Sequence, residues 1–325
     1  MAAPSVSVII ATLGESHLLP KTLEEVRHQA DALGAEVVVI VNASEARSKY
    51  IGAHEWTHLA DRVLFEERPG KSHALNRGIQ EARGDILAFT DDDAIPGPGW
   101  LEEITKPFGP AGPVLVGTGG RVQPIYPNGQ PPEWYRILLH PNRRDLFVRC
   151  HSFLGPCHDL GSEARTYIFH PEKFVVPLGV NCAYRREALL KRGYQPHLGP
   201  NRATGLRGGE DTELGVDFLR SGRSILYCPK AEVYHPVTPE RMTFEYVRHG
   251  YFLRGVENVR IRHALGLPPV KTAESGRKLF SQVLRYFWFS ARLNPKRHRA
   301  YMHSCYRFGV LWESFRKAMK ANQDC

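Results

Sequence analysis

Residues 85–96 read DILAFTDDDAIP, a short apolar run followed at once by three aspartates. An apolar run of this length, bounded by polar residues, is typical of a strand that is covered on both faces of a parallel sheet. In such sheets ligands bind at the carboxyl ends of the strands. The position of Asp91, Asp92 and Asp93 directly after the strand therefore predicts that these carboxylates face a ligand.

Two similar strand patterns precede this stretch, at residues 5–12 (SVSVIIAT) and 36–42 (EVVVIVN). Helical patterns separate them: one has Pro20 in its first turn and stops near Gly34, and one begins with Ser72 as its cap and ends at Gly84. Short apolar strands that alternate with helices predict βαβ units in a doubly wound α/β sheet.

In that sheet Thr12 and Asn42, which end the first two strands, lie on the same rim as the aspartates. Downstream, residues 117–178 are rich in Gly, Pro, His and Arg and predict loops with little regular structure. Regular structure is expected again as two helices and two short strands, at residues 186–192, 211–220, 224–228 and 231–235.

After Pro239 the pattern is mainly helical, with breaks at Pro268-Pro269 and Asn294-Pro295. We therefore expect an α/β body over residues 1–240 and a basic, mainly helical region over residues 241–325. The chain has 325 residues, with 42% apolar and 24% charged residues, which is an ordinary globular composition. It has no apolar run of 18 residues, which excludes a conventional transmembrane helix. Its first residues do not have the pattern of a secretory signal.

The six cysteines contain no Cys-x-x-Cys pair, so neither a zinc site nor a redox motif is indicated. This cysteine usage favours a reducing cytoplasm. The net charge of +9 is concentrated at the C-terminus, where residues 241–325 hold 17 Lys/Arg against 5 Asp/Glu. Aromatic residues interleave with these cations, for example in the run Tyr286-Phe287-Trp288-Phe289 beside Arg285 and Arg292. Two interpretations of this basic region stay open. It associates peripherally with an anionic membrane surface, or it is a helical cap that packs on the body.

The acidic run suits a hard divalent cation. Along an extended segment Asp91 and Asp93 project the same way, while Asp92 turns aside. Carboxylate oxygens with no His or Cys ligands nearby in the sequence favour Mg²⁺ or Mn²⁺.

A second acidic motif, GGEDTE at residues 208–213, opens an amphipathic helix. Acidic residues are favoured in a first helical turn by the helix dipole alone. Together with the aspartate run, however, Glu210 and Asp211 also suit a carboxylate base beside a metal site.

The ordered set of motifs resembles family 2 glycosyltransferases, which have the GT-A fold. The resemblance rests on GKSHALNRG (70–78), TDDDAIP (90–96), GVNCAYRR (179–186), GEDTE (209–213) and VYHP (233–236), and it covers roughly residues 5–240. It implies a Rossmann-like, doubly wound mixed sheet with a basic helical extension. It also implies an enzyme that moves a sugar from a nucleoside diphosphate donor to an acceptor hydroxyl, with inversion.

Residue by residue, the resemblance implies that Asp91 contacts the ribose and that Asp93 ligates Mg²⁺ or Mn²⁺. Asp92 belongs to the same acidic motif, Lys71 lies near the nucleotide, and Thr12 lines the base pocket.

The resemblance further implies that Asp211 is the general base, with Glu210 beside it. Val41 stands where the family usually carries an Asp that contacts the nucleobase of the donor. The sequence therefore leaves the identity of that nucleobase open, and Asn42 is the remaining polar residue that could contact it. His235 is either a metal ligand or a structural histidine. Arg248 and Arg254 are candidates for clamping a pyrophosphate.

The Gln-x-x-Arg-Trp signature of processive members is absent, which favours transfer of a single sugar to a lipid-linked or saccharide acceptor at the inner face of a membrane. Two enzymatic alternatives stay open: a glycoside hydrolase that uses Asp93 and Asp211, and a nucleotidyltransferase. A nucleic-acid binder is a third, suggested only by the basic tail. No nucleic acid is expected as a partner, because no recognition motif accompanies the charge.

Overall fold

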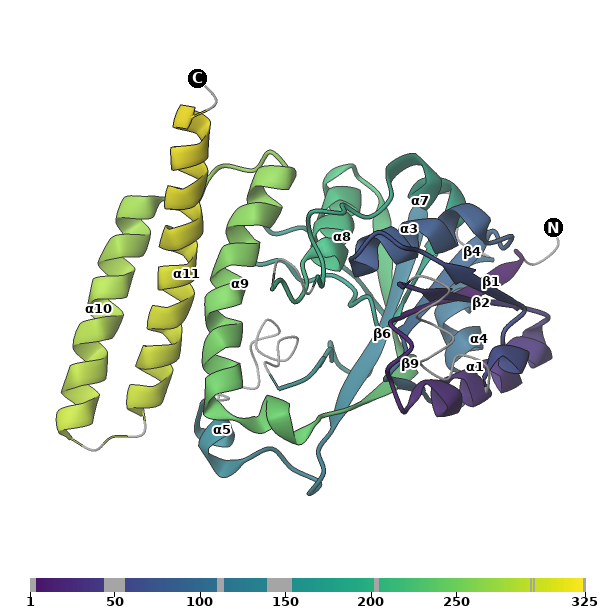
Figure 1. Cartoon of the computed structure of the whole chain (residues 1–325), viewed down its shortest axis with the longest axis horizontal. Coiled ribbons are helices and arrows are strands. Elements are labelled where there is room, and N and C mark those ends of the chain that lie inside the picture. The colour runs from purple at the N-terminus through teal and green to yellow at the C-terminus, as the bar shows by residue number, and fades with distance from the viewer. Residues whose placement is uncertain are drawn as a thin grey trace. The chain divides into compact units, whose positions relative to one another are not determined.

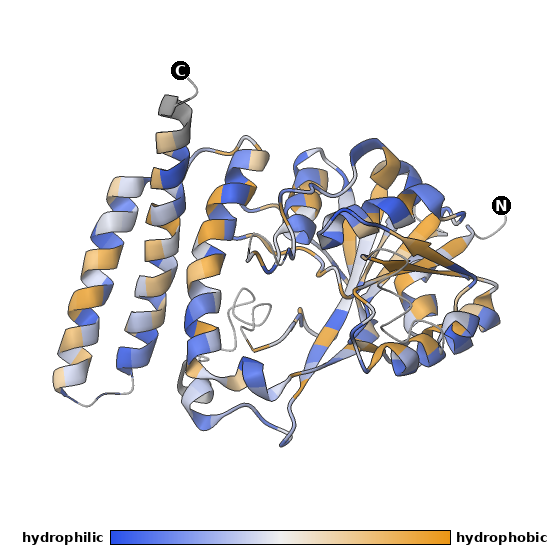
Figure 2. Cartoon of the chain, in the orientation of Figure 1, coloured by the Kyte–Doolittle hydropathy of each residue, from blue (hydrophilic) through white to orange (hydrophobic). Residues whose placement is uncertain are grey.

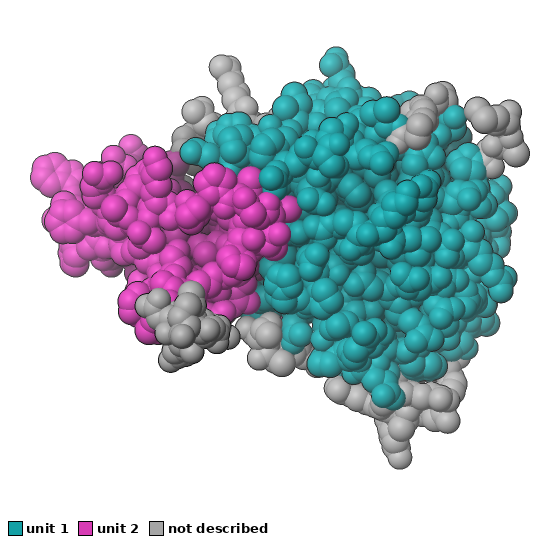
Figure 3. Space-filling model, turned by 90° about the horizontal axis from the view of Figure 1, so that it is seen from above, with its two compact units in different colours: residues 1–125, 149–151, 156–236 teal, residues 126–148, 152–155, 237–325 magenta. Residues whose placement is uncertain are grey.

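The computed structural model describes residues 4–43, 56–109, 114–138, 154–201, 205–292, 294 and 296–323. Cys150 and Cys325 lie outside the described residues, and the four described cysteines are free thiols. The chain divides into two compact units, coloured separately in Figure 3. The first comprises mainly residues 1–125 and 156–236, and the second mainly residues 126–148 and 237–325. A functional division at residue 240 stays a prediction.

The first unit is built on a mixed sheet with the strand order β3-β2-β1-β4-β8-β6-β9-β5, and β7 pairs with β9 (Figure 1). The strands β1, β2, β3 and β4 pair in parallel, whereas β8 runs antiparallel to both β4 and β6. The strands are β1 (Val6–Thr12), β2 (Glu36–Val41), β3 (Arg62–Phe65), β4 (Ile86–Asp91), β5 (Ile95–Pro96), β6 (Leu115–Ile125), β7 (Arg165–Thr166), β8 (Cys182–Arg185) and β9 (Ser224–Pro236). This is the doubly wound mixed α/β sheet that the sequence predicts.

Helices cover both faces of this sheet (Figure 1). They are α1 (Leu19–Leu33), α3 (Lys71–Glu81), α4 (Trp100–Thr105), α7 (Arg186–Arg192) and α8 (Glu210–Arg220). Alternate residues of β1 face opposite sides: Val8 and Ile10 belong to the core that α1 and α4 cover, and Ile9 lies under α3. All but the first residue of β2 are buried, as expected for a strand with helices on both faces.

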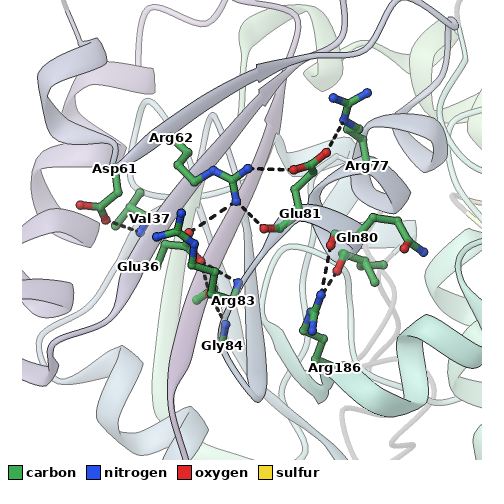
Figure 4. Close-up of polar contacts among 12 residues, drawn as sticks. Glu36, Val37, Asp61, Arg62, Arg77, Gln80, Glu81, Arg83, Gly84 and Arg186 are labelled. Carbon is green, nitrogen blue, oxygen red and sulfur yellow. Dashed lines mark hydrogen bonds and ion pairs between the residues drawn. The ribbon is translucent and has the colours of Figure 1, made fainter.

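Polar contacts join α3 and the loop after it to the sheet, at the end where β2 and β3 begin (Figure 4). The guanidinium of Arg62 lies 2.8 Å from Oε2 of Glu81 at the end of α3 and 3.8 Å from Oε1 of Glu36. The other oxygen of Glu36 accepts hydrogen bonds from the Ser7 hydroxyl at 2.6 Å and from the Arg83 backbone N–H at 2.9 Å. These contacts fix α3 against the sheet from the end opposite to the aspartates.

Three local predictions are wrong. Ser72 does not cap α3, because Gly70 is the N-cap and the Ser72 hydroxyl, already inside the helix, donates to the Leu198 carbonyl at 3.1 Å. Residues 117–125 are not loop but part of the 11-residue strand β6 (Leu115–Ile125), which pairs with both β8 and β9. The two short C-terminal strands are one strand, β9, which bends at a register shift near Cys228.

The second unit contains α5 (Glu133–Leu138), α9 (Phe244–Ala264), α10 (Thr272–Ala291) and α11 (Lys296–Gln323). α11 lies between α9 and α10 (Figure 1). A Cβ on Gly255 would lie 2.2 Å from the Tyr306 carbonyl, and one on Gly309 would lie 2.1 Å from the Phe252 carbonyl. These two glycines therefore let α9 and α11 approach closely. None of the helices in the described ranges combines the length and the apolarity that crossing a bilayer requires.

Candidate functional site

The sheet brings the sequence-predicted rim residues together at the carboxyl ends of its central strands. Thr12 ends β1 and Asp91 ends β4, and the two strands are neighbours in parallel register. His235 is near the end of β9, which pairs with β5 through Ile95. The turn that carries Asp92 and Asp93 joins β4 to β5, so it connects these two parts of the rim.

Asp91, Asp93 and His235 form a cluster in which one potential ligand atom from each residue lies within 4.8 Å of the others. Among the described residues, no other group of three such side chains meets this condition. His235 is buried, and its Nε2 atom lies 3.1 Å from Oδ1 of Asp93. The two carboxylates are half-buried, so the cluster has one side open to a ligand.

The hydrogen bonding of His235 fits a metal site. Its Nδ1 lies 3.0 Å from the carbonyl oxygen of Pro236, which can only accept, so Nδ1 carries a proton and donates. In the neutral ring the Nε2 lone pair then faces a carboxylate oxygen of Asp93. Two acceptors at this distance need a proton or a shared cation between them. The donor set of two carboxylates and an imidazole fits Mn²⁺ or Mg²⁺.

Asp92 turns away from this cluster, as the alternation predicts. Its side chain accepts a hydrogen bond from the Thr12 hydroxyl, and its backbone carbonyl accepts one from the Ser16 hydroxyl at 2.9 Å. Burial, together with the charges of Asp93 and Asp91, raises the pKa of Asp92 to about 6, although the Thr12 hydrogen bond opposes the shift. Thr12 and Asp92 thus join the ends of β1 and β4.

Lys71 begins α3 and makes an ion pair with Asp91. Burial lowers the pKa of Lys71, but the carboxylates of Asp91, Glu210 and Asp211 outweigh this effect and hold the pKa above its ordinary value. The preceding Gly70 has a φ of 124°, which a residue with a side chain rarely adopts. This turn directs the lysine to the rim of the sheet.

Asn42 holds the loop that leads into α3. Its amide nitrogen donates to the carbonyls of Glu66 and Arg68, both at 2.8 Å, and its oxygen accepts from the Gly70 N–H at 2.9 Å. Arg68 in turn makes two side-chain hydrogen bonds to the carboxylate of Glu66, each 2.8 Å long. These bonds lower the pKa of Glu66 to about 2, although burial opposes the shift. The sequence patterns did not identify this Glu66–Arg68 pair.

Glu210 and Asp211 occupy the first turn of α8. Asp211 is half-buried, and its Oδ2 accepts a hydrogen bond from the Gly179 N–H at 3.0 Å. Glu210 is buried, and its Oε2 accepts no hydrogen bond from the described residues. Burial raises the pKa of Glu210, and the neighbouring Asp211 adds to the shift, whereas Lys71 opposes it. The acidic pair therefore lies within electrostatic range of the Lys71–Asp91 pair.

An ion-pair network that the sequence patterns missed anchors α8. Arg192, the last residue of α7, pairs with the fully buried Glu213 and lies 3.0 Å from Oδ2 of Asp217. Burial raises the pKa of Glu213, and the hydrogen bond from Arg192 opposes this shift. The sequence feature that could have indicated this network is the four-residue spacing of Glu213 and Asp217, which places both carboxylates on one face of the helix.

Arg248 and Arg254 lie on α9 in the second unit, and both are half-buried. The Arg248 guanidinium makes a bidentate ion pair with Glu245, three residues earlier, with Nε 2.9 Å from Oε2. A role of these two arginines in clamping a pyrophosphate stays a prediction.

Two curated relatives come from Haloferax volcanii. Glycosyltransferase AglE is 36% identical over 130 residues, which are 39% of this chain and 42% of that protein. Glucosyl-dolichyl phosphate glucuronosyltransferase is 23% identical over 259 residues, which are 77% of this chain and 75% of that protein. The match to AglE thus spans less than half of its length.

Among solved structures, mannosyltransferase PcManGT from Pyrobaculum calidifontis, in complex with GDP-Man and Mn²⁺, superimposes with a TM-score of 0.53. It is 19% identical, and the alignment covers 99% of this chain and 76% of that one. This likeness concerns the fold, which is of the GT-A type. The family model described as "Glycosyl transferase family 2" matches residues 7–192, more than half of the chain. The chain therefore belongs to glycosyl transferase family 2.

Proposed function

We propose that this chain transfers a single sugar from a nucleoside diphosphate sugar to a hydroxyl of a lipid-linked or saccharide acceptor, with inversion. Family membership favours a transferase over the hydrolase and the nucleotidyltransferase that the sequence left open. The observation that carries the proposal is the cluster of Asp91, Asp93 and His235 at the rim of the sheet, beside Lys71.

For the donor, Asp91 accepts a hydrogen bond from a ribose hydroxyl, and Lys71 neutralises negative charge next to it. The ion pair between these two side chains supports this arrangement. Thr12 and Asp92 hold each other and so shape the floor of the pocket. Asn42 acts by holding the loop before α3, because its amide is engaged with three backbone groups.

Asp93 and His235 would hold the divalent cation, Mn²⁺ or Mg²⁺. When bound, such an ion offsets the charge that the leaving diphosphate gains. The protein contributes an imidazole whose orientation is fixed by the Pro236 carbonyl. PcManGT, which shares the fold, was solved with Mn²⁺.

Asp211 is the general base in this proposal. Its carboxylate takes the proton of the acceptor hydroxyl while that oxygen bonds to the anomeric carbon and the bond to the diphosphate breaks on the opposite face. The Gly179 N–H orients the carboxylate. Because burial raises its pKa, Glu210 tends to keep its own proton and is less suited to accept one. This favours Asp211 as the residue that takes the proton of the acceptor hydroxyl. Glu210, buried in the same helical turn, lies beside this base.

The lipid-linked acceptor and a peripheral position at the cytoplasmic face of a membrane are the finer parts of the proposal. The name of the second relative, glucosyl-dolichyl phosphate glucuronosyltransferase, supports a lipid phosphate acceptor. Arg248 and Arg254 remain our candidates for contacting a pyrophosphate.

A thermal-shift panel tests the proposal. UDP-, GDP-, CDP- and dTDP-sugars are each added with Mn²⁺ and with EDTA, and the melting temperature is followed. We expect one nucleotide to raise it only with metal, and Asp93→Ala to abolish that rise. A folded sample that responds to no nucleotide would contradict the proposal.

A further inference from the structure

A groove of ≈ 650 Å³ runs between α10 and α11 in the second unit. Its lining includes five lysines and arginines and one histidine, and the other lining residues are uncharged. We call it the basic groove. Its cationic residues are Lys278, Arg285, Lys296, Arg299, His303 and Arg307.

The described part of α10 and α11 contains two acidic residues, Glu274 and Glu313, against the five lysines and arginines of the groove. Glu274 pairs with Lys278, one turn along α10. Glu313 is buried, and its carboxylate is shared by Arg260 at 3.0 Å and Arg316 at 2.8 Å. Among the described residues, Arg285 and Lys296 make no ion pair, whereas the charge of Arg307 contributes to the lowered pKa of Glu274.

Arg299 is a partly buried member of the basic groove. Burial lowers the pKa of this guanidinium, and Tyr251 only partly opposes the shift. Cations held together in a concave surface create a positive potential that is stronger than that of scattered surface lysines. An anion with several oxygens relieves this repulsion, and guanidinium groups pair with phosphate oxygens in bidentate geometry.

Large apolar side chains are exposed on the same helix pair. On α10, Phe280, Leu284, Phe287 and Trp288 are between 53% and 66% exposed, and three of them recur at the helical spacing 280, 284, 287. Figure 2 shows hydrophobic positions along α10. The guanidinium of Arg292 stacks on the Trp288 ring at 3.4 Å. Exposed aromatic residues flanked by arginines are typical of helices that lie in the interface of an anionic bilayer.

We infer that the basic groove binds phosphate groups and that the headgroups of anionic lipids supply them, while the exposed face of α10 enters the interface beside them. The chemistry is recognition of phosphate by guanidinium and ammonium groups. A soluble polyphosphate offers the same chemistry without the apolar contact. The inference does not depend on sugar transfer.

The test measures binding of the full chain to vesicles of phosphatidylglycerol and phosphatidylcholine, with vesicles of phosphatidylcholine alone as the reference. The groove variant is Arg285→Glu with Arg307→Glu. Its matched control is Lys173→Glu with Lys230→Glu, which changes the net charge equally at exposed positions of the first unit. Because each basic residue near an anionic surface contributes about 1 kcal/mol, the groove variant should bind at least about 30-fold more weakly. The control should bind within about threefold of the parent protein.

Two further arms separate the sources of phosphate. Phe280→Ser with Phe287→Ser should weaken vesicle binding but leave binding of inorganic pyrophosphate in EDTA unchanged. The parent protein could bind pyrophosphate but not vesicles, and the groove variant could lose the pyrophosphate binding. This result would show that the groove binds a soluble phosphate, and it would overturn lipid headgroups as the source. Equal losses in the groove variant and its control would overturn the groove itself. Tighter binding to duplex DNA than to vesicles would overturn the lipid as the ligand of the basic groove and favour a nucleic acid. Circular dichroism of each variant confirms that it is folded.

Discussion

The Nε2 atom of His235 lies 3.1 Å from Oδ1 of Asp93, although 141 residues separate the two along the chain. The contact exists because β5, directly after the aspartates, pairs with β9 through Ile95 and Tyr234. The Pro236 carbonyl fixes the proton on Nδ1, so the ring presents Nε2 to the carboxylates. This orientation of a buried imidazole is the reason why we propose His235 as a metal ligand.

Replacing this imidazole should weaken metal binding. In His235→Gln we expect the affinity for Mn²⁺ to fall by at least about tenfold, since one ligand loses its fixed orientation. The measurement is the free Mn²⁺ signal in an electron paramagnetic resonance titration. His170→Gln, at an exposed position away from the cluster, is the control and should leave the affinity unchanged. An unchanged affinity in His235→Gln would assign the ring a structural role.

Asp211→Asn should separate turnover from donor binding. An asparagine oxygen can still accept the Gly179 N–H, so the first turn of α8 should stay in place, but the amide cannot take a proton. We expect turnover to fall by about 10²–10⁴-fold while the donor affinity stays within about twofold.

The matched variant is Glu210→Gln. Because burial already raises the pKa of Glu210, its neutral isostere should retain a much larger share of the turnover. If Asp211→Asn kept full turnover, the base would have to be sought elsewhere. If it lost donor binding as well, its role would be structural.

The sequence predicted β1, β2 and β4 because these strands are continuous apolar runs between polar ends, but it did not predict the short strands β3, β5, β7 and β8. It missed β6, whose segment LVGTGGRVQPI contains three glycines and a proline and so has low intrinsic strand propensity. The partners on both sides, β8 and β9, make it a strand. Pairing between distant segments overrides local preference here, and a local pattern does not contain that information.

The same distinction applies to the site. Asp91 and Asp93 could be placed at the rim because their position follows from the end of a strand. The ion pair of Lys71 with Asp91 and that of Arg192 with Glu213 depend on how α3, α7 and α8 lie on the sheet. The engagement of Asn42 with a loop backbone depends on the path of residues 66–70. No spacing rule predicts such contacts.

Breaking the anchor of α8 should cost stability. Arg192→Met leaves the fully buried Glu213 without its counter-ion, and we expect a loss of about 3–5 kcal/mol in the free energy of unfolding. Adding Glu213→Gln should recover part of the loss, because no buried charge remains unpaired. Urea denaturation measures both.

The neighbouring Lys191→Met is the control for this series. Its partner Glu187 is one helical turn away, and both side chains are at least 70% exposed. Such an exposed pair contributes little to stability, so Lys191→Met should be nearly neutral. Equal losses at positions 191 and 192 would contradict a specific role for the buried pair.

His158 should make stability depend on pH. The ring is buried, and its Nε2 lies 2.7 Å from the Tyr167 hydroxyl. Burial lowers the pKa of His158 to about 4, although Asp159 opposes the shift. The unfolded chain has the ordinary value of about 6.5, so between pH 4 and 6.5 it holds a proton that the folded chain does not. Stability therefore rises with pH through this window, and this residue alone should lower it by about 2 kcal/mol between pH 7 and 5.

The difference between the parent protein and His158→Gln isolates this contribution, because the other titrating groups are common to both. We expect the variant to be less stable than the parent at pH 7, since it loses the contact with Tyr167, and the gap to narrow by about 2 kcal/mol at pH 5. Should the variant not fold, an NMR titration of the parent gives the same answer: the His158 ring signals should stay in the neutral form at pH 5. A ring that protonates near pH 6.5 in the folded protein would show that water reaches it, and the predicted acid sensitivity would then have another origin.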